Sequence, residues 1–289
     1  MTASLAFPLL MSLGVAGAAT AVHRRLPPRL AARFATIGLI VVTLAALPTA
    51  LVVAVAFLAH VPVLGLGFQW CARAFGLHGS VPIWVGIPVV ALLATGAVRT
   101  VRLLRSHRRL RLDASHPVHV AHSHKPYAVT LPGRGGQIVI STALDDMLDD
   151  DERRIVLAHE AAHGRYRHDR YLLVAELAAA ALPPLRAMAR RVNYSIERWA
   201  DEAAAAACGD RRLVAITLGR VALHANPATV AGFAGLGVAA RMGALLAPPV
   251  PTPRRYHLIA LWSTLAVATG FSLYQLHHVE RLLTALCPH

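Results

Sequence analysis

One short run with two histidines and a glutamate is the part of this sequence best suited to chemistry. His159, Glu160 and His163 belong to the run His-Glu-Ala-Ala-His, in which the histidines are four residues apart. Residues four apart share one face of a helix, so both imidazoles can reach one metal ion while the glutamate lies beside it. This spacing is typical of zinc metalloproteases, where the glutamate is the general base for the attacking water. We therefore predict that His159 and His163 bind one Zn²⁺ ion and that Glu160 is catalytic.

A catalytic zinc ion usually has three protein ligands, so the two histidines need a third partner. The best candidate is Glu197, which Asp201 follows at helical spacing. Alone, a Glu-x-x-x-Asp pair is more often the solvated face of an alanine-rich helix. After a His-Glu-x-x-His run, we predict instead that Glu197 is the third ligand. Asp201 is then expected to accept the free ring N–H of a ligand histidine and to hold its tautomer.

The helices that must position these residues have recognisable ends. Residues 144–151 form an Asp-rich turn, and Asp149 with Glu152 gives a capping-box pattern ahead of an apolar stretch. Gly164 precedes a charged segment, so the helix that carries the histidines is expected to have about four turns. Gly209 is expected to end the helix of Glu197, and Asp210 to cap the next one.

Three short β-prone segments precede the histidine helix. Residues 118–120, 127–131 and 137–141 are predicted strands, and residues 132–136 are predicted to form the turn of the last pair. A small sheet beside the metal could offer an edge to which an extended substrate adds as a further strand. Alternatively, the hairpin only covers the helix, and the pattern does not separate the two.

The composition indicates a membrane protein. Hydrophobic residues make up 56% of the chain and its mean hydropathy is +0.51, which exceeds the values usual for soluble domains. Four apolar stretches are long enough to span a bilayer: 2–22, 34–59, 79–98 and 258–276. The first resembles a secretory signal, but its arginines follow it rather than precede it, which favours a retained helix.

Arginines are distributed unevenly around these stretches. They cluster in the loop after the first stretch and again after the third, so both regions are predicted to face the cytoplasm of a cell membrane protein. The net charge of +14 does not indicate nucleic-acid binding, because the arginines lie beside spans, where they contact anionic lipid, and no nucleic-acid motif accompanies them.

We therefore expect a mainly α-helical membrane protein with about four transmembrane helices and a cytosolic α+β gluzincin domain that contains a small sheet. The expected division is a three-helix membrane region at 1–104, a metalloprotease domain at 105–256, and a fourth span with a short tail at 257–289.

Several further segments carry weaker signals. Residues 172–185 are too short to cross a bilayer and are expected to pack on the zinc helix or to enter the bilayer surface. Residues 225–253 suit a connector or a lid. Cys208 is expected in the core, and Cys71 with Cys287 could pair on the outer side. Two arginines and several histidines could stabilise an oxyanion, with no basis for a choice; the arginines are Arg211 and Arg212.

These motifs together resemble the integral-membrane zinc metallopeptidases of the gluzincin type. The likeness covers roughly residues 110 to 245 and is carried by five matching segments: Pro-Tyr-Ala-Val-Thr-Leu-Pro-Gly from Pro126, Ile-Val-Ile-Ser from Ile138, the acidic run 148–152, the His-Glu-Ala-Ala-His run, and Glu197 with Asp201. It is closer to the BlaR1/MecR1-type group, peptidase family M56, with the HtpX and Ste24 group, family M48, as a relative. The resemblance also implies a structural acidic residue, which would be Asp169.

The resemblance implies a protein or peptide substrate and site-specific cleavage of a repressor, an anti-regulator or the enzyme itself in response to an outside signal. A penicillin-binding sensor domain is not expected, so the sensor would be a separate subunit. Two alternatives stay open: an HtpX-like quality-control protease, and a non-proteolytic, zinc-stabilised membrane signal transducer. The complete motif with Glu160 argues against the transducer, because structural zinc sites are usually closed by Cys and His.

Overall fold

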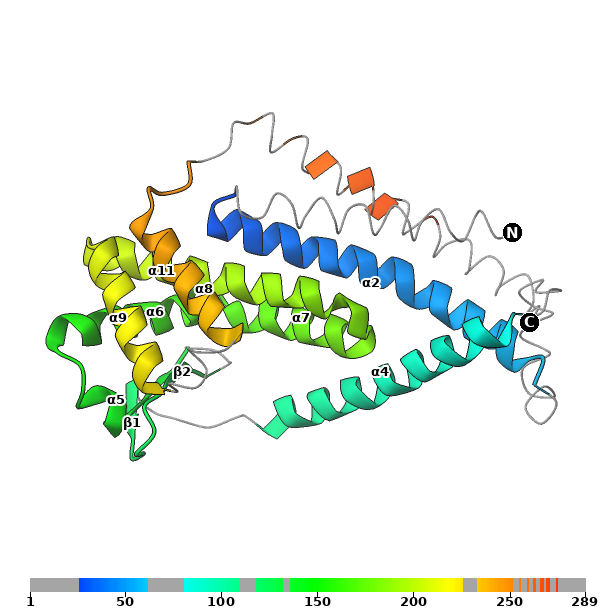
Figure 1. Ribbon diagram of the computed structural model, residues 1–289, viewed down its shortest axis with the longest axis horizontal. Coiled ribbons are helices and arrows are strands. Elements are labelled where there is room, and N and C mark those ends of the chain that lie inside the picture. The colour runs from blue at the N-terminus through cyan, green and yellow to red at the C-terminus, as the bar shows by residue number, and fades with distance from the viewer. Residues whose placement is uncertain are drawn as a thin grey trace.

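The computed structural model describes residues 26–61, 81–109, 118–131, 136–225 and 233–251, together with single residues between 255 and 274. The described part is mostly helical with one small sheet (Figure 1). Its elements in chain order are α2 (Pro28–Leu58), α4 (Ile83–Arg109), β1 (Val118–Ala121), β2 (Ala128–Thr130), β3 (Ile138–Ser141), α5 (Thr142–Asp145), α6 (Asp150–Arg165), α7 (His168–Ala181), the 3₁₀ turn η2 (Pro183–Leu185), α8 (Arg186–Cys208), α9 (Arg211–Ala225) and α11 (Phe233–Leu246).

Two of these helices, α2 and α4, are long and apolar enough to cross a membrane. They correspond to the predicted stretches at 34–59 and 79–98. Figure 1 shows them meeting at the end far from the sheet, where Phe57 packs so closely on Gly86 that a Cβ there would lie 2.0 Å from its ring. The predicted stretch at 2–22 lies outside the described residues. Of the stretch at 258–276 only single helical residues are described, among them Trp262, edge-on to Phe34 of α2.

Helix α2 also packs against the helices that follow the zinc motif. One buried apolar cluster joins Leu39 and Val42 of α2 to Ala178 of α7 and to Val192 and Ile196 of α8. The segment predicted at 172–185 is therefore a helix held between α2, α4 and α8, followed by the turn at Pro183–Leu185. A candidate membrane helix and a helix of the site thus share one core.

The sheet has three strands in the order β1-β3-β2. Strand β2 pairs with β3 antiparallel, with Ala128 opposite Ile140, while β1 pairs with the other side of β3 in parallel. All three strands lie where they were predicted, to within one residue at each end. Most of the predicted turn at 132–136 lies outside the described residues. Strand β2 is left at an edge and packs against α6, which places that edge beside the zinc helix.

The helix ends behave as their residue types predict. Asp149 and Glu152 form the full capping box of α6, Gly209 ends α8 with a φ of 76°, and Asp210 Oδ1 accepts the backbone N–H of Leu213 at 2.9 Å. The prediction for Cys208 was wrong: its side chain is exposed. It occupies the last residue of α8, directly before the left-handed glycine, where the helix has already left the core.

The backbone of α6, the helix that carries His159 and His163, lies very close to the backbone just before β3. A Cβ at Gly164 of α6 would lie 2.9 Å from the Cα of Gly136, just before β3. We expect Gly164→Ala to lower stability by about 1–3 kcal/mol, because the added methyl meets backbone that cannot easily move. Gly237→Ala is the matched control, since nothing lies within 4 Å of its Cβ and alanine favours the helix by about 1 kcal/mol. Unfolding in detergent should give shifts of opposite sign, and equal shifts would contradict the close approach.

Candidate active site

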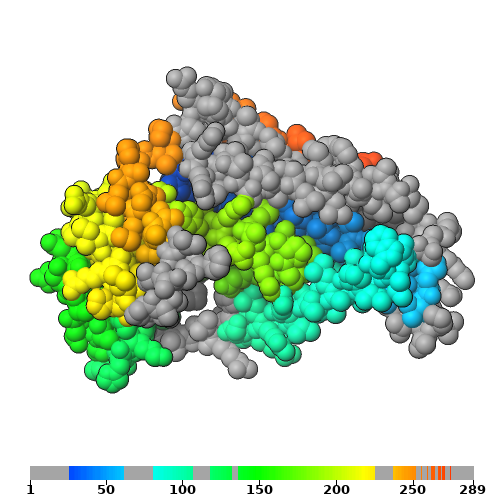
Figure 2. All heavy atoms as spheres, viewed as in Figure 1, coloured from blue at the N-terminus to red at the C-terminus, as the bar shows by residue number. Residues whose placement is uncertain are grey.

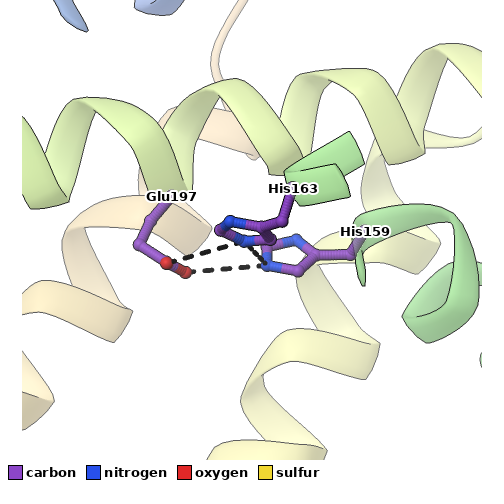
Figure 3. A group of neighbouring side chains, drawn as sticks. All are labelled: His159, His163 and Glu197. Atoms are coloured by element: carbon purple, nitrogen blue, oxygen red, sulfur yellow. Dashed lines mark hydrogen bonds and ion pairs between the residues drawn. The ribbon is translucent and has the colours of Figure 1, made fainter. Parts of the chain in front are cut away.

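Helices α6 and α8 bring the three predicted ligands together (Figure 3). The Nε2 atoms of His159 and His163 lie 3.2 Å apart. The two carboxylate oxygens of Glu197 lie 3.6 Å from Nε2 of His159 and 3.7 Å from Nε2 of His163. Zinc bonds of about 2.0–2.1 Å in a tetrahedral site separate ligand atoms by about 3.3 Å. The donor atoms, two imidazole nitrogens and one carboxylate, therefore fit a single zinc ion in both type and spacing.

The outer ring nitrogens of both histidines are held by neighbouring side chains. His159 Nδ1 lies 3.2 Å from Oδ1 of Asp201, the contact predicted for that aspartate. His163 Nδ1 lies 3.1 Å from Nδ1 of His168, the first residue of α7. Because each Nδ1 is engaged in this way, each Nε2 is left to face Glu197 and the metal position.

An arginine from α11 completes the polar wall of the site. Arg241 donates from Nε and one terminal nitrogen to the two oxygens of Asp201, at 2.8 and 2.6 Å. Its other terminal nitrogen lies 2.8 Å from Oε2 of Glu197. The side chains of Arg241 and Asp201 are 13% and 1% exposed, so this bidentate pair is shielded from solvent. One guanidinium therefore orients the carboxylates of both Asp201 and Glu197.

Charges around the metal position shift several ionisation equilibria. Burial disfavours the charged imidazole of His159, but Asp201 and Glu197 outweigh this and raise its pKa to about 9. Burial likewise works against ionised Glu197 and Asp201, yet His159 and Arg241 hold the pKa of both carboxyls below the usual range. Burial lowers the pKa of His163. Both carboxylates are thus ionised at neutral pH, and a metal ion must displace a proton from His159.

His168 is suited to accept a hydrogen bond rather than to carry charge. Its side chain is fully buried, and burial, followed by the nearby His163, lowers its pKa to about 3. A neutral His168 can accept the N–H of His163 at Nδ1, which places its own hydrogen on Nε2. That Nε2 atom is buried and has no partner among the described residues. The structural role that the resemblance implies for Asp169 stays a prediction.

We expect His168→Phe to weaken zinc binding about 10- to 100-fold, the usual effect of losing a group that orients a ligand histidine. Phenylalanine preserves the ring packing of His168 against Trp199, whose centroid lies 4.8 Å away, but removes the acceptor. Zinc affinity can be measured by competition with a chelator. His224→Phe, at an exposed position of α9, is the control. An unchanged affinity for His168→Phe would mean that the ring acts only through packing.

The predicted general base is held by the sheet. Oγ1 of Thr130, in β2, lies 2.8 Å from Oε2 of Glu160 and 2.7 Å from its backbone oxygen. A single hydroxyl hydrogen can serve either acceptor, so Thr130 holds both the helix and the carboxylate. The edge strand β2 therefore fixes the position of Glu160 beside the two histidines.

A cavity of about 170 Å³ adjoins these groups. Its polar lining includes His159, Glu160, Glu197 and Arg241, and its apolar lining includes Ile155, Val214, Leu218 and Val221. The candidates Arg211 and Arg212 do not line it. Arg211 instead pairs with Glu202 and donates to the C-terminal carbonyls of α11, while Arg212 is exposed. An apolar hollow beside a candidate metal site is suited to hold an apolar side chain of a ligand.

Three residues of the site carried no usable sequence signal. Thr130 was only part of a predicted strand, His168 was one of many histidines, and Arg241 lies in the segment expected to be a connector or a lid. That segment instead contains α11, which packs on α8 and α9. The only sequence hint was that Arg241 is the lone charged residue between Arg220 and Arg254, and an isolated charge in an apolar segment is often paired.

Residues 101–183 match the family model of Peptidase family M48. The match covers less than a third of the chain, contains the sheet, α6 and α7, and ends before Glu197. No curated protein and no solved structure matches the chain. The closer likeness to the M56 group stays a prediction. The matched segment is therefore similar to a metallopeptidase family, and it contains His159 and His163, which with Glu197 form a cluster that could hold a metal ion.

Proposed function

We propose that this protein is a zinc-dependent, membrane-embedded endopeptidase that cleaves a protein substrate. The observation that carries the proposal is the convergence of His159, His163 and Glu197 at spacings suited to one zinc ion. Glu160 follows His159 on α6 and lines the same cavity as His159 and Glu197. This is a His₂Glu ligand set with a neighbouring base, the arrangement of catalytic rather than structural zinc sites.

Each residue then has a defined task. His159, His163 and Glu197 hold the ion, which when bound would supply Lewis-acid polarisation of the scissile carbonyl and of water. Glu160, oriented by Thr130, accepts a proton from the attacking water and returns it to the departing amine. Asp201 and Arg241 keep the ring of His159 and the carboxylate of Glu197 in position.

The substrate is proposed to bind as an extended strand. Strand β2 is at the edge of the sheet next to α6, and an extended segment that adds to such an edge gains main-chain hydrogen bonds. Thr130 of β2 contacts Glu160, so a segment paired with β2 would pass the general base. The apolar cavity would then accept one side chain of the substrate.

The proposed location is the cell membrane, with multiple spans and the site on the cytoplasmic side. The arginine-bearing start of α2 and the arginine-bearing end of α4 both lie toward the site, whereas their apolar ends meet far from it (Figure 1). Arginines mark the cytoplasmic ends of spans. The proposed division stays as expected: membrane helices in 1–104, the protease domain in 105–256 and a last span in 257–289.

We further propose a regulatory role, as the BlaR1-like resemblance implies, with a sensor on a separate subunit. Arg29 and Arg33 of α2 both lie over the ring of Trp199, each 5.8 Å from its centroid. Trp199 lies two residues after Glu197 and contacts the ring of His168. A shift of α2 would therefore move Trp199, and with it the neighbouring Glu197 and His168 of the proposed zinc site. This arrangement suits an enzyme whose activity is regulated by a signal at the membrane.

The test compares new protein N-termini in cells that express the wild type or Glu160→Gln at matched membrane levels. Glutamine preserves the size of the side chain and leaves the three ligands intact but cannot accept the proton, so we expect zinc to be retained and turnover to fall by 10²- to 10⁴-fold. Few Glu160-dependent fragments would support regulatory cleavage, and many would support quality control. Equal fragments in both strains under envelope stress would overturn proteolysis and favour the signal transducer.

A further inference from the structure

A second cavity, which is shallow and wide open to the surface, lies away from the proposed zinc site, between α4, α7 and the start of α8. It has a volume of about 510 Å³ and is lined by three arginines, one glutamate, a serine and apolar residues: Arg99, Arg102, Leu103, Ser106, Glu176, Ala179, Ala180 and Arg186. Figure 2 shows α4, in cyan, directly against α7 on the face in view. None of these residues belongs to the chemistry proposed above.

The arginines converge from two separate elements. Arg99 and Arg102 are three residues apart and so share a face of α4, while Arg186 opens α8 after the turn η2. All three are exposed. Within the described part of the chain, none of these three arginines has an ion pair or a side-chain hydrogen bond. Three arginines and one glutamate, Glu176, are thus the charged residues that line this cavity in the described part of the chain.

The position of the cavity along α4 gives its depth in a membrane. The apolar part of α4 ends at Val98, and Arg99 and Arg102 follow within one turn, which corresponds to the headgroup level of a spanning helix. Gly96 lies against the end of α7, since a Cβ there would lie 2.2 Å from the carbonyl oxygen of Ala181. The tip formed by α7 and η2 therefore reaches the apolar part of α4, and Arg186 lies close to the same boundary.

We propose that this cavity binds the headgroup of an anionic phospholipid from the cytoplasmic leaflet. The planar guanidinium group of arginine can donate two parallel hydrogen bonds to the oxygens of one phosphate. Basic pockets between membrane helices are suited to phospholipid headgroups. Leu103, Ala179 and Ala180 give the hollow apolar walls, and exposed Val98 continues an apolar surface toward the bilayer. A phosphodiester with attached acyl chains fits this combination better than free phosphate. The inference rests on the proposed membrane insertion but not on catalysis.

The lipid would act on the segment that joins the two zinc helices. Helix α6 carries both histidines and α8 carries Glu197. The chain between them passes through α7, which forms one wall of the cavity, and then through η2. A bound headgroup would fasten Arg186 to α4 and so hold the start of α8 at the membrane surface. Lipid composition would in this way affect how firmly α7 and α8 are docked.

The experiment measures lipid retention by the full chain in detergent, using native mass spectrometry with phosphatidylglycerol or phosphatidylcholine. We expect the wild type to prefer phosphatidylglycerol and the Arg102→Gln/Arg186→Gln double variant to lose about 25-fold in affinity, from roughly five-fold per arginine. Arg105→Gln, on the same helix but outside the cavity, is the control, and zinc content reports that each variant is folded. Equal losses in Arg105→Gln would show a diffuse basic surface and overturn the site.

A second measurement uses the unaltered protein. A photoactivatable phosphatidylglycerol should crosslink to peptides that contain residues 99–106 or 176–186, and phosphatidylcholine in excess should not suppress the reaction. Suppression by millimolar inorganic phosphate would instead identify a free-phosphate site, and crosslinks elsewhere would contradict the proposal. Because the readout is lipid binding, Glu160→Gln should behave like the wild type, so failure of this site and failure of the proposed protease are distinguishable.

Discussion

Glu197→Ala is expected to strip the zinc ion from the protein and to abolish proteolysis. Its carboxylate faces the Nε2 atoms of both histidines, at 3.6 and 3.7 Å, and no other carboxylate joins this cluster within the described residues. Two histidines alone do not make a catalytic zinc site. The loss of zinc affinity should exceed the 10- to 100-fold that follows removal of a supporting hydrogen bond.

The matched control for this change is Glu202→Ala, on the same helix. Glu202 pairs with Arg198 at 3.2 Å and with Arg211, so its removal affects packing between α8 and α9 but not the metal position. Zinc content after dialysis against a weak chelator, together with cleavage of the substrate identified in cells, gives both readouts. Full zinc content in Glu197→Ala would show that this glutamate is not a ligand.

Arg241→Ala is expected to cost about 3–5 kcal/mol of the free energy of unfolding, the range for removing one partner of a buried charged pair. Arg241 is the cation that neutralises both Asp201, which is 1% exposed, and Glu197. Without it, two carboxylates share a shielded site in which only the histidines offset their charge. Chemical unfolding in detergent should show this loss.

The loss should be smaller with zinc present than with zinc removed, because the metal ion supplies positive charge next to Glu197. This difference separates an electrostatic role from simple packing, which would cost the same in both states. Arg212→Ala, an exposed arginine on α9, should change stability by no more than about 0.5 kcal/mol. Equal losses for Arg241→Ala with and without zinc would contradict the electrostatic account.

The two histidines proposed as zinc ligands could be predicted from the sequence, because metal binding from one helix constrains their spacing. His159 and His163 must be four apart to share a helix face, and the fit of Asp149 with Glu152 and of Gly209 with Asp210 follows from unpaired backbone groups at helix ends. The positions of the three strands could also be predicted from the sequence, because β-branched residues between turn residues form a local pattern. The order β1-β3-β2 could not be predicted, since a parallel partner is chosen by packing beyond the hairpin.

The supporting residues depended on distant parts of the chain. Arg241 lies 40 residues from Asp201 along the sequence, and only the packing of α11 on α8 brings it there. In the sequence, His168 cannot be distinguished from a surface histidine. In the structure, Arg167 has a left-handed backbone conformation just before α7, and the ring of His168 contacts His163. Cys208 was placed in the core because alanine-rich helices often bury cysteine, but its position at the helix end leaves it exposed.

Residue type and short-range spacing are therefore sufficient to predict the proposed chemistry: two imidazoles, a carboxylate ligand and a base, on helices whose ends the sequence marks. They are insufficient for what holds those groups, because hydrogen bonds and ion pairs between distant segments exist only after α2, α8 and α11 have packed. The physical reason is that metal chemistry is set by a few atoms within one or two helical turns, whereas orientation and charge compensation come from burial of the whole core.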